Sequence, residues 1–355
     1  MRITTDEGFT GWGESYSGCY ATEVTRAALV RLSVGLVGQN VLDYDCVLEK
    51  VRFKNRYWAM RGLGAQATSA IESAVLDLAA QAVGQPLWKL FGAAKPRPIL
   101  LYASAGENVF SPEEILAEAR FYAAQGYRAY KLRCGGARYT DSSNRLGLDI
   151  ERVAAAREGL GSEGMLFVDV AVPQRPIAWE RGRAEAYLES LRRFDVRFLE
   201  EPAMTYDVVR YRELQALQLI PTAGGESFCC PEEFEPFFEA GAYGVAQPDA
   251  AVVGGPQSCL RVCRRAKGLG VPVSLHAWSA GVGLAQNLQA GWAADGILAM
   301  EWPQAAHPLA SRPIEGLLEF RNGYAVPCEK PGLGVAIPEA LLSEYAYQSG
   351  CDRDF

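Results

Sequence analysis

Apolar positions along this chain follow either a strand-like or a helix-like spacing, and from about residue 96 onward segments of the two kinds alternate. Short apolar, β-favouring runs predict strands near residues 99–104, 127–133, 165–169, 196–200, 219–226, 243–249, 271–276 and 297–301. Helical periodicity between them predicts helices near residues 112–124, 146–160, 180–193, 206–217, 231–240, 256–269 and 283–294. This alternation predicts an α/β barrel that is one helix short of the regular form.

Most of the predicted strands end on polar residues that can take part in chemistry. Successive strand ends lie roughly 23–36 residues apart, about the length of one strand, one helix and two loops. The carboxyl ends of barrel strands share one rim, where barrel enzymes keep their chemistry, so these side chains are expected to converge. They are Lys131 with Arg133, Asp169, Glu200, Glu226, Asp249, His276 and Glu301.

The opening block, residues 1–95, follows another pattern and is predicted to be an α+β domain. Residues 3–14 alternate around a tight Asp-Glu-Gly turn and predict a β-hairpin. Pro96 and Pro98 mark the boundary with the barrel, and the tail, 324–355, is expected to pack back on the opening block. Helices in the block are expected near residues 22–37, 43–53 and 64–83.

The amino-acid composition and net charge limit the kinds of molecule that this protein is expected to bind. The 355 residues include 35 Lys and Arg against 42 Asp and Glu, which gives a net charge of −7. Because no basic run could neutralise phosphates, neither nucleic acid nor an anionic membrane is expected as a partner. With no signal peptide and no apolar run of membrane-spanning length, a cytoplasmic protein is expected.

The nine cysteines are scattered and include no C-x-x-C pair, so neither a disulfide framework nor a zinc site is expected. Cys259 and Cys263 are four residues apart on a predicted helix, a spacing that favours packing.

Taken in order, these motifs resemble the mandelate racemase group of the enolase superfamily over almost the whole chain. The resemblance implies a modified TIM barrel, (β/α)7β, at 96–323, with an N-terminal α+β capping domain at 1–95 that the C-terminal segment, 324–355, completes. The matching features are Gly11-Trp12-Gly13-Glu14, Lys131-x-Arg133, Asp169, Glu200, Glu226, Asp249 with Gly254-Gly255, His276, Glu301 and Pro331-Gly332-Leu333-Gly334.

The resemblance further implies Mg²⁺ held by Asp169, Glu200 and Glu226. Carboxylate oxygens on neighbouring strand ends suit this hard cation. A single acid at a strand end more often caps a loop or pairs with Arg, but three in succession favour the metal. Strand alternation places the side chain of Glu201 on the opposite face from Glu200, so Glu201 is not expected to be a ligand.

The implied chemistry is removal of the proton α to a carboxylate from a small-molecule substrate. A Lys or His base working beside Mg²⁺ is the general pattern of this superfamily. Here His276 matches the base and Asp249 its carboxylate partner, while Lys131, Arg133 and Glu301 complete the expected catalytic set. His307, in a Pro-containing loop, is not expected to be catalytic. The resemblance also implies a homo-oligomer.

Three departures from the family pattern bear on the reaction. Arg133 stands where the family has the second lysine of Lys-x-Lys. A guanidinium is better suited to binding a carboxylate than to accepting a proton. Ala171 stands where the family often has Asn. The chain also begins at the hairpin, so either translation starts upstream or the cap lacks a strand and its lid loop. Tyr16, Tyr20, Tyr57 and Trp58, in the remaining loops of the cap, are candidate lid residues.

Three functions remain open from the sequence. One good base fits an acid-sugar dehydratase, because a single imidazole can take the α-proton and return it to the leaving hydroxide. A racemase, epimerase or cycloisomerase is the alternative, with Arg133 as an unusual second base. The third possibility is a catalytically impaired paralogue with a binding or regulatory role. The sequence does not name the acid.

Overall fold

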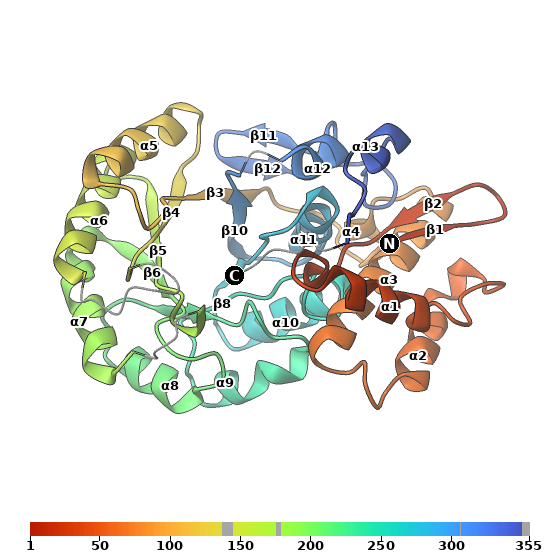
Figure 1. Cartoon of the computed structure of the whole chain (residues 1–355), viewed down its shortest axis with the longest axis horizontal. Helices are drawn as coiled ribbons and strands as arrows, with labels where there is room; N and C mark the ends of the chain where they lie inside the picture. Colours follow the sequence, from red (N-terminus) through yellow and green to blue (C-terminus); the bar gives the residue numbers. More distant parts are fainter. Residues whose placement is uncertain (137–144, 175–178, 306, 350–355) are drawn as a thin grey trace.

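The computed structural model describes residues 1–136, 145–174, 179–305 and 307–349. The last six residues of the predicted C-terminal segment therefore lie outside the described part of the chain. Figure 1 shows a ring of helices around a barrel of strands, with the N-terminal hairpin and helices gathered to one side.

Eight parallel strands form the predicted barrel, and the pairing of the last strand with the first closes it, with Met300 opposite Leu101. The strands are β3 (Ile99–Ala105), β4 (Ala129–Arg133), β5 (Met165–Asp169), β6 (Val196–Glu200), β7 (Thr222–Gly224), β8 (Val245–Ala246), β9 (Val273–Leu275) and β10 (Ile297–Pro303). The helices between them are α5 (Pro112–Ala124), α6 (Leu146–Leu160), α7 (Arg181–Leu191), α8 (Val208–Ala216), α9 (Glu235–Glu239), α10 (Pro256–Gly268) and α11 (Gly281–Ala293). The predicted fold class is confirmed.

Two of the barrel strands stop at least two residues before their predicted ends. The runs 219–226 and 243–249 were expected to be strands, but β7 and β8 stop at Gly224 and Ala246. Gly225 adopts a φ of 105°, which ends the extended backbone, and Pro248 has no N–H to donate to a neighbouring strand. Glu226 and Asp249 therefore lie in the loops just beyond their strands.

The N-terminal block forms the predicted hairpin, β1 (Arg2–Thr4) and β2 (Thr10–Trp12), and β2 packs on the long helix α3 (Gly62–Ala82). Gly13 permits this packing, because a Cβ there would lie 1.9 Å from the carbonyl oxygen of Ala70. The remaining helices are α1 (Thr22–Leu32), α2 (Tyr44–Lys54) and α4 (Leu87–Leu90).

The first predicted helix is shorter than expected. The expected span was 22–37, but α1 ends at Leu32. Gly35 and Gly38 adopt φ values of 96° and 78°, in the left-handed region that a continuing helix cannot use. The residues after α1 therefore form turns.

The segment after the last barrel strand contacts the N-terminal block. Gly332 forms a parallel bridge with Pro86, and the backbone N–H of Leu333 donates to Asp77 of α3 at 2.8 Å. The segment also contains α12 (Pro308–Ser311), β11 (Glu319–Arg321), β12 (Tyr324–Val326) and α13 (Glu339–Glu344), of which β12 pairs antiparallel with β3.

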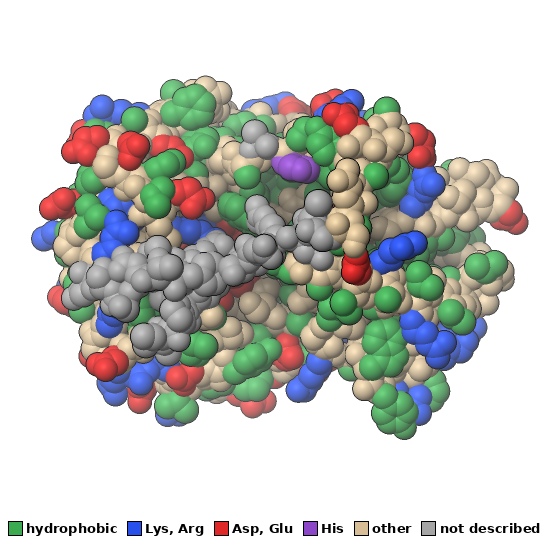
Figure 2. All heavy atoms as spheres, in the orientation of Figure 1, with side chains coloured by type: hydrophobic (Ala, Val, Ile, Leu, Met, Phe, Trp, Pro, Cys, Tyr) green, Lys and Arg blue, Asp and Glu red, His purple; other side chains and the backbone are tan. Residues whose placement is uncertain are grey.

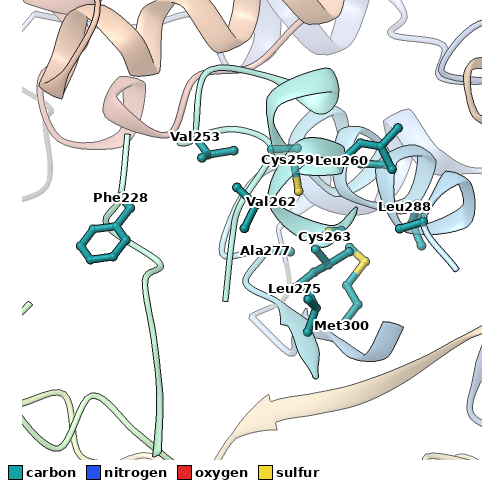
Figure 3. Packing of buried hydrophobic residues seen from close by; sticks show 14 of the residues in the cluster. Phe228, Val253, Cys259, Leu260, Val262, Cys263, Leu275, Ala277, Leu288 and Met300 are labelled. Carbon is teal, nitrogen blue, oxygen red and sulfur yellow. The ribbon is translucent and has the colours of Figure 1, made fainter. Parts of the chain in front are cut away.

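Side chains alternate between the two faces of the barrel strands. Leu275 and Met300 point outward and pack with Cys263 of α10, so the residues beside them in sequence point inward (Figure 3). Cys259 and Cys263 are both buried in this outer layer, which agrees with the packing role predicted for them. On the face shown in Figure 2, the described acidic and basic side chains are interspersed and form no continuous band of one sign. Among the described residues, no helix combines the length and the apolar character needed to cross a membrane.

Candidate active site

On the inner face of the barrel, the side chains change from apolar to polar towards the carboxyl ends of the strands. A buried apolar layer, which includes Phe167, Phe198, Val245 and Ala299, fills the interior. Because side chains on one face recur every second residue, the next inward positions lie at the carboxyl-end rim. These positions hold Lys131, Asp169, Glu200, Gln247 and Glu301.

Lys131 is the cation at the centre of this polar layer. Its Nζ lies 2.9 Å from both carboxylate oxygens of Glu200 and 2.9 Å from Oε1 of Glu301. Ser104 Oγ donates to the same Glu301 oxygen at 2.6 Å. Burial lowers the pKa of Lys131, but Glu200 and Glu301 raise it well above its ordinary value. Lys131 therefore stays protonated and is not a second base in this arrangement.

His276 and Asp249 form the expected pair. Nδ1 of His276 lies 2.8 Å from Oδ2 of Asp249, while the other carboxylate oxygen accepts from the backbone of Ala251 at 2.7 Å and from Nδ2 of Asn287 at 2.8 Å. Asn287 was not found from the sequence, because it lies in the middle of helix α11 and no strand-end pattern marks it. It fixes the orientation of the carboxylate that orients the base.

Nε2 of His276 faces the polar layer. It lies 3.7 Å from Glu226 and 3.6 Å from Glu301. Burial lowers the pKa of His276, but the charges of Glu226 and Glu301 and the bond to Asp249 raise it to about 10. The edge of the His276 ring also meets Tyr16, with the ring centroids 5.8 Å apart. Tyr16, one of the proposed lid residues, thus brings the N-terminal block to the base.

The other proposed lid residues divide into two groups. Tyr20 lies beside Tyr16, and their hydroxyls are 2.5 Å apart. Tyr57 and Trp58 are exposed on the N-terminal block, at 88% and 41%. Burial, followed by the neighbouring Tyr20 and the charge of Glu226, raises the pKa of Tyr16, so its phenol stays protonated.

Arg133 ends strand β4 opposite Asp169 in the register of β5. Its guanidinium lies 3.5 Å from the Asp169 carboxylate and 5.9 Å from the ring centroid of Trp278. Burial lowers the pKa of Arg133, but Asp169 and Glu226 raise it above its ordinary value. Arg133 therefore stays positively charged.

The three proposed metal ligands share one part of the rim. Asp169 is opposite Glu200 in the sheet register, and Glu226 follows the next strand. Burial raises the pKa of Glu200 to about 8; Lys131 opposes this shift, and Asp169, Glu226 and Glu301 add to it. Hard oxygens and mutual repulsion suit a divalent cation. Among the described residues, however, no three His, Cys, Asp or Glu side chains converge closely enough to bind one ion, so binding by all three would require their side chains to rotate away from Lys131 and Arg133.

Three further residues were singled out in the sequence. Glu201 has a φ of 48°, so strand alternation does not extend to it, and burial followed by the charge of Glu226 raises its pKa. Ala171, also at positive φ, donates its backbone N–H to Asp169 at 2.8 Å, so the main chain makes a contact at this position. His307 is exposed, and its side chain accepts the backbone N–H of Leu309 at the start of helix α12.

Two family models account for nearly all of this architecture. The mandelate racemase / muconate lactonizing enzyme N-terminal domain matches residues 1–92, and the enolase C-terminal domain-like model matches residues 114–341. The chain belongs to the mandelate racemase/muconate lactonizing enzyme family of the enolase superfamily. Enzymes of this family generally depend on Mg²⁺.

Relatives extend the similarity over the full domain pair. A D-galactonate dehydratase of Klebsiella pneumoniae (strain 342) is 27% identical, over 97% of this chain and 90% of the relative. One from Verminephrobacter eiseniae (strain EF01-2) is 28% identical over the same shares. A solved enolase-superfamily member from Polaromonas sp. JS666 is 28% identical with a TM-score of 0.84, covering 98% of this chain and 90% of that one. The 3,6-anhydro-D-galactonate cycloisomerase of Zobellia galactanivorans, at 24% identity and a TM-score of 0.84 over 97% and 92% of the chains, shares the fold.

Proposed function

We propose that this protein is a Mg²⁺-dependent acid-sugar dehydratase. The observation that carries the proposal is geometric: Asp249 holds Nδ1 of His276, so that Nε2 faces the polar layer, while the neighbouring cations Lys131 and Arg133 are paired with carboxylates. The D-galactonate dehydratases among its relatives support a sugar acid as the substrate class.

Asp169, Glu200 and Glu226 would hold the Mg²⁺, which supplies stabilisation of the negative charge that develops on the substrate carboxylate. Arg133 would hold that carboxylate from the rim, since a guanidinium binds carboxylates through paired donors. Asp249 and Asn287 keep the His276 ring fixed, with Nε2 directed into the polar layer.

His276 performs both proton transfers in this proposal. Nε2 takes the α-proton, and the electrons of the broken C–H bond enter the developing double bond. The β-carbon–oxygen bond then breaks, and the leaving hydroxide receives the proton from Nε2 and departs as water. The enol that remains becomes a 2-oxo-3-deoxy acid. The neutral imidazole that starts the cycle is favoured when the charge of Glu226 is neutralised.

The test is turnover of a panel of sugar acids, including D-galactonate, with Mg²⁺ and with excess chelator. We expect a 2-oxo-3-deoxy acid with Mg²⁺, little product with chelator, and a loss of at least about 10²-fold in His276→Asn. Interconversion of α-epimers without loss of water would favour the racemase, epimerase or cycloisomerase. No turnover of any acid would favour the impaired paralogue.

A further inference from the structure

Gln247 occupies a position in the polar layer that the proposed chemistry does not use. It follows β8, and its backbone N–H donates to the carbonyl of Gly224 at 3.0 Å. Val245, two residues earlier, points into the apolar interior of the barrel. Strand alternation therefore directs the side chain of Gln247 to the same inner face, one step nearer the rim.

The amide of Gln247 is buried without a hydrogen-bond partner. Its exposed fraction is 0%, equal to that of Glu200, and neither Oε1 nor Nε2 has a partner among the described residues. The next inward side chain on β9, Ser274, also has a buried hydroxyl without a partner there. Val273 is opposite Ala246 in the register, so Gln247 and Ser274 continue along adjoining strands.

An equally buried amide in helix α11 has partners for both its oxygen and its nitrogen. Gln289 of α11 is also 0% exposed; its Oε1 accepts from the backbone of Trp88 at 2.9 Å, and its Nε2 donates to the carbonyl of Leu333 at 3.2 Å. A buried amide without partners destabilises a protein by about 1–3 kcal/mol. Such a residue at the rim of a barrel is therefore better explained by a ligand than by packing.

The chemistry of an amide limits what that ligand can present. A primary amide offers one donor and one acceptor side by side, which matches two adjacent hydroxyl groups, one donating to Oε1 and one accepting from Nε2. The substrate carboxylate is already served by cations in the layer. We propose that Gln247 is a specificity-determining residue that binds an adjacent pair of hydroxyls on the carbon chain of the sugar acid. This assignment rests on the proposed function.

The first test needs no substrate. Gln247→Met replaces the amide with an apolar chain of similar size, so the melting temperature of the ligand-free protein should rise by about 1–4 °C. Gln289→Met is the matched control, and it should lower the melting temperature by about 2–6 °C, because two buried backbone groups lose their partner. If Gln247→Met lowers the melting temperature as Gln289→Met does, the amide is structural and the proposal is overturned.

The second test uses the sugar acid that gives the fastest turnover and its 4-deoxy and 5-deoxy forms. In the parent protein, at least one deoxy form should lose about 10- to 100-fold in kcat/KM, because it leaves the amide unpaired. Gln247→Met should lose a similar factor on the full acid and then discriminate less than about threefold between the forms.

The two tests separate the two proposals. Unchanged discrimination in Gln247→Met overturns the role of Gln247 while the dehydratase stands. Absence of turnover in the parent overturns the dehydratase and the sugar-acid ligand with it. The melting temperatures then still decide whether the resting protein carries an unsatisfied amide at this position.

Discussion

At the scale of single residues, Arg133 and His276 decide between one-base and two-base chemistry. If His276 is the sole base, exchange of the substrate α-proton with solvent deuterium should vanish in His276→Asn. Exchange should persist, slowed by about 10- to 100-fold, in Arg133→Met, because losing a clamp weakens binding without removing the proton acceptor. The measurement is deuterium incorporation, followed by NMR.

A two-base enzyme behaves differently in the same experiment. Each single variant would then keep exchange from only one α-epimer, the one whose proton faces the surviving base. Arg133→Lys adds information, since a lysine can accept a proton more readily and should introduce α-epimerisation that the parent lacks. A parent protein that already interconverts α-epimers as fast as it turns over would contradict the one-base dehydratase.

Glu226 tests the metal at the same scale. Its carboxylate is 15% exposed and makes a long contact to His276, so it contributes little to the stability of the barrel. Glu226→Gln should weaken Mg²⁺ binding at least about tenfold in calorimetric titration and leave the melting temperature of the metal-free protein unchanged. Glu232→Gln, on an exposed residue paired with Arg261, is the control and should bind Mg²⁺ like the parent. Equal Mg²⁺ affinity in both variants would remove Glu226 from the ligand set.

The sequence pointed to residues at or just beyond the ends of strands, and it did not point to the residues that support them. His276 and Asp249 were predicted as a pair, and the structure places them 2.8 Å apart. Ser104 and Asn287 were missed, because a hydroxyl or an amide inside an element carries no pattern that distinguishes it from an ordinary polar residue. The contact of Tyr16 with His276 depends on how two distant segments meet, which spacing along the chain does not encode.

At the scale of elements, the packing of β2 on α3 depends on glycine. Gly13→Ala would place a Cβ 1.9 Å from the Ala70 carbonyl oxygen, so the strand must move off the helix. We expect a loss of about 1–3 kcal/mol in the free energy of unfolding, measured by denaturant titration. Gly18→Ala is the matched control in the same block, because no atom lies within 4 Å of its added Cβ. Similar stabilities for the two variants would show that β2 does not need this close approach.

The succession of strand-like and helix-like segments was the most informative pattern at this scale. It predicted the barrel and, because the carboxyl ends of barrel strands share one rim, the expected convergence of the polar strand ends. It overestimated β7 and β8, where Gly225 and Pro248 end the extended backbone sooner than the apolar run suggests. The β-propensity of a run shows where a strand can form, but the backbone conformation of single residues such as Gly225 determines where the strand ends.

At the scale of the whole molecule, Asp77 joins three segments. Its carboxylate accepts backbone N–H groups from Trp12 of the hairpin and Leu333 of the C-terminal segment, at 2.9 and 2.8 Å. Burial raises the pKa of Asp77 to about 6, above its ordinary value near 4, and the hydrogen bonds oppose that shift. Because the folded state holds the proton more tightly than the unfolded chain, Asp77 favours folding at low pH and this contribution is lost as the pH rises through 6.

Asp77→Asn isolates this effect. Between about pH 4 and pH 6 the parent should lose stability relative to the variant with rising pH, by up to about 1.4 kcal/mol per pH unit. The variant lacks one acceptor, which adds a constant offset and leaves the slope as the readout. Urea titrations at several pH values measure it. Parallel stability curves for parent and variant would show that Asp77 titrates normally in the folded protein.

The division into residues 1–95, 96–323 and 324–355 is our proposal for how these segments act as units. The sequence pattern and the prolines at the boundary indicated this division, but they could not show which side chains connect the segments. Asp77, Gln289 and Trp88 supply those ties from buried positions, and none of them stands out in the sequence.

The hydrogen bond between Asp77 and Leu333 can form only late in the synthesis of the chain. The two residues are 256 positions apart, so a ribosome adding about 5–20 residues per second needs roughly 10–50 s to reach the second after the first. Throughout that interval the hairpin and α3 lack the strand-like segment around Gly332 that later covers them. The N-terminal surface of a nascent chain therefore stays incompletely covered until the whole barrel has been synthesised.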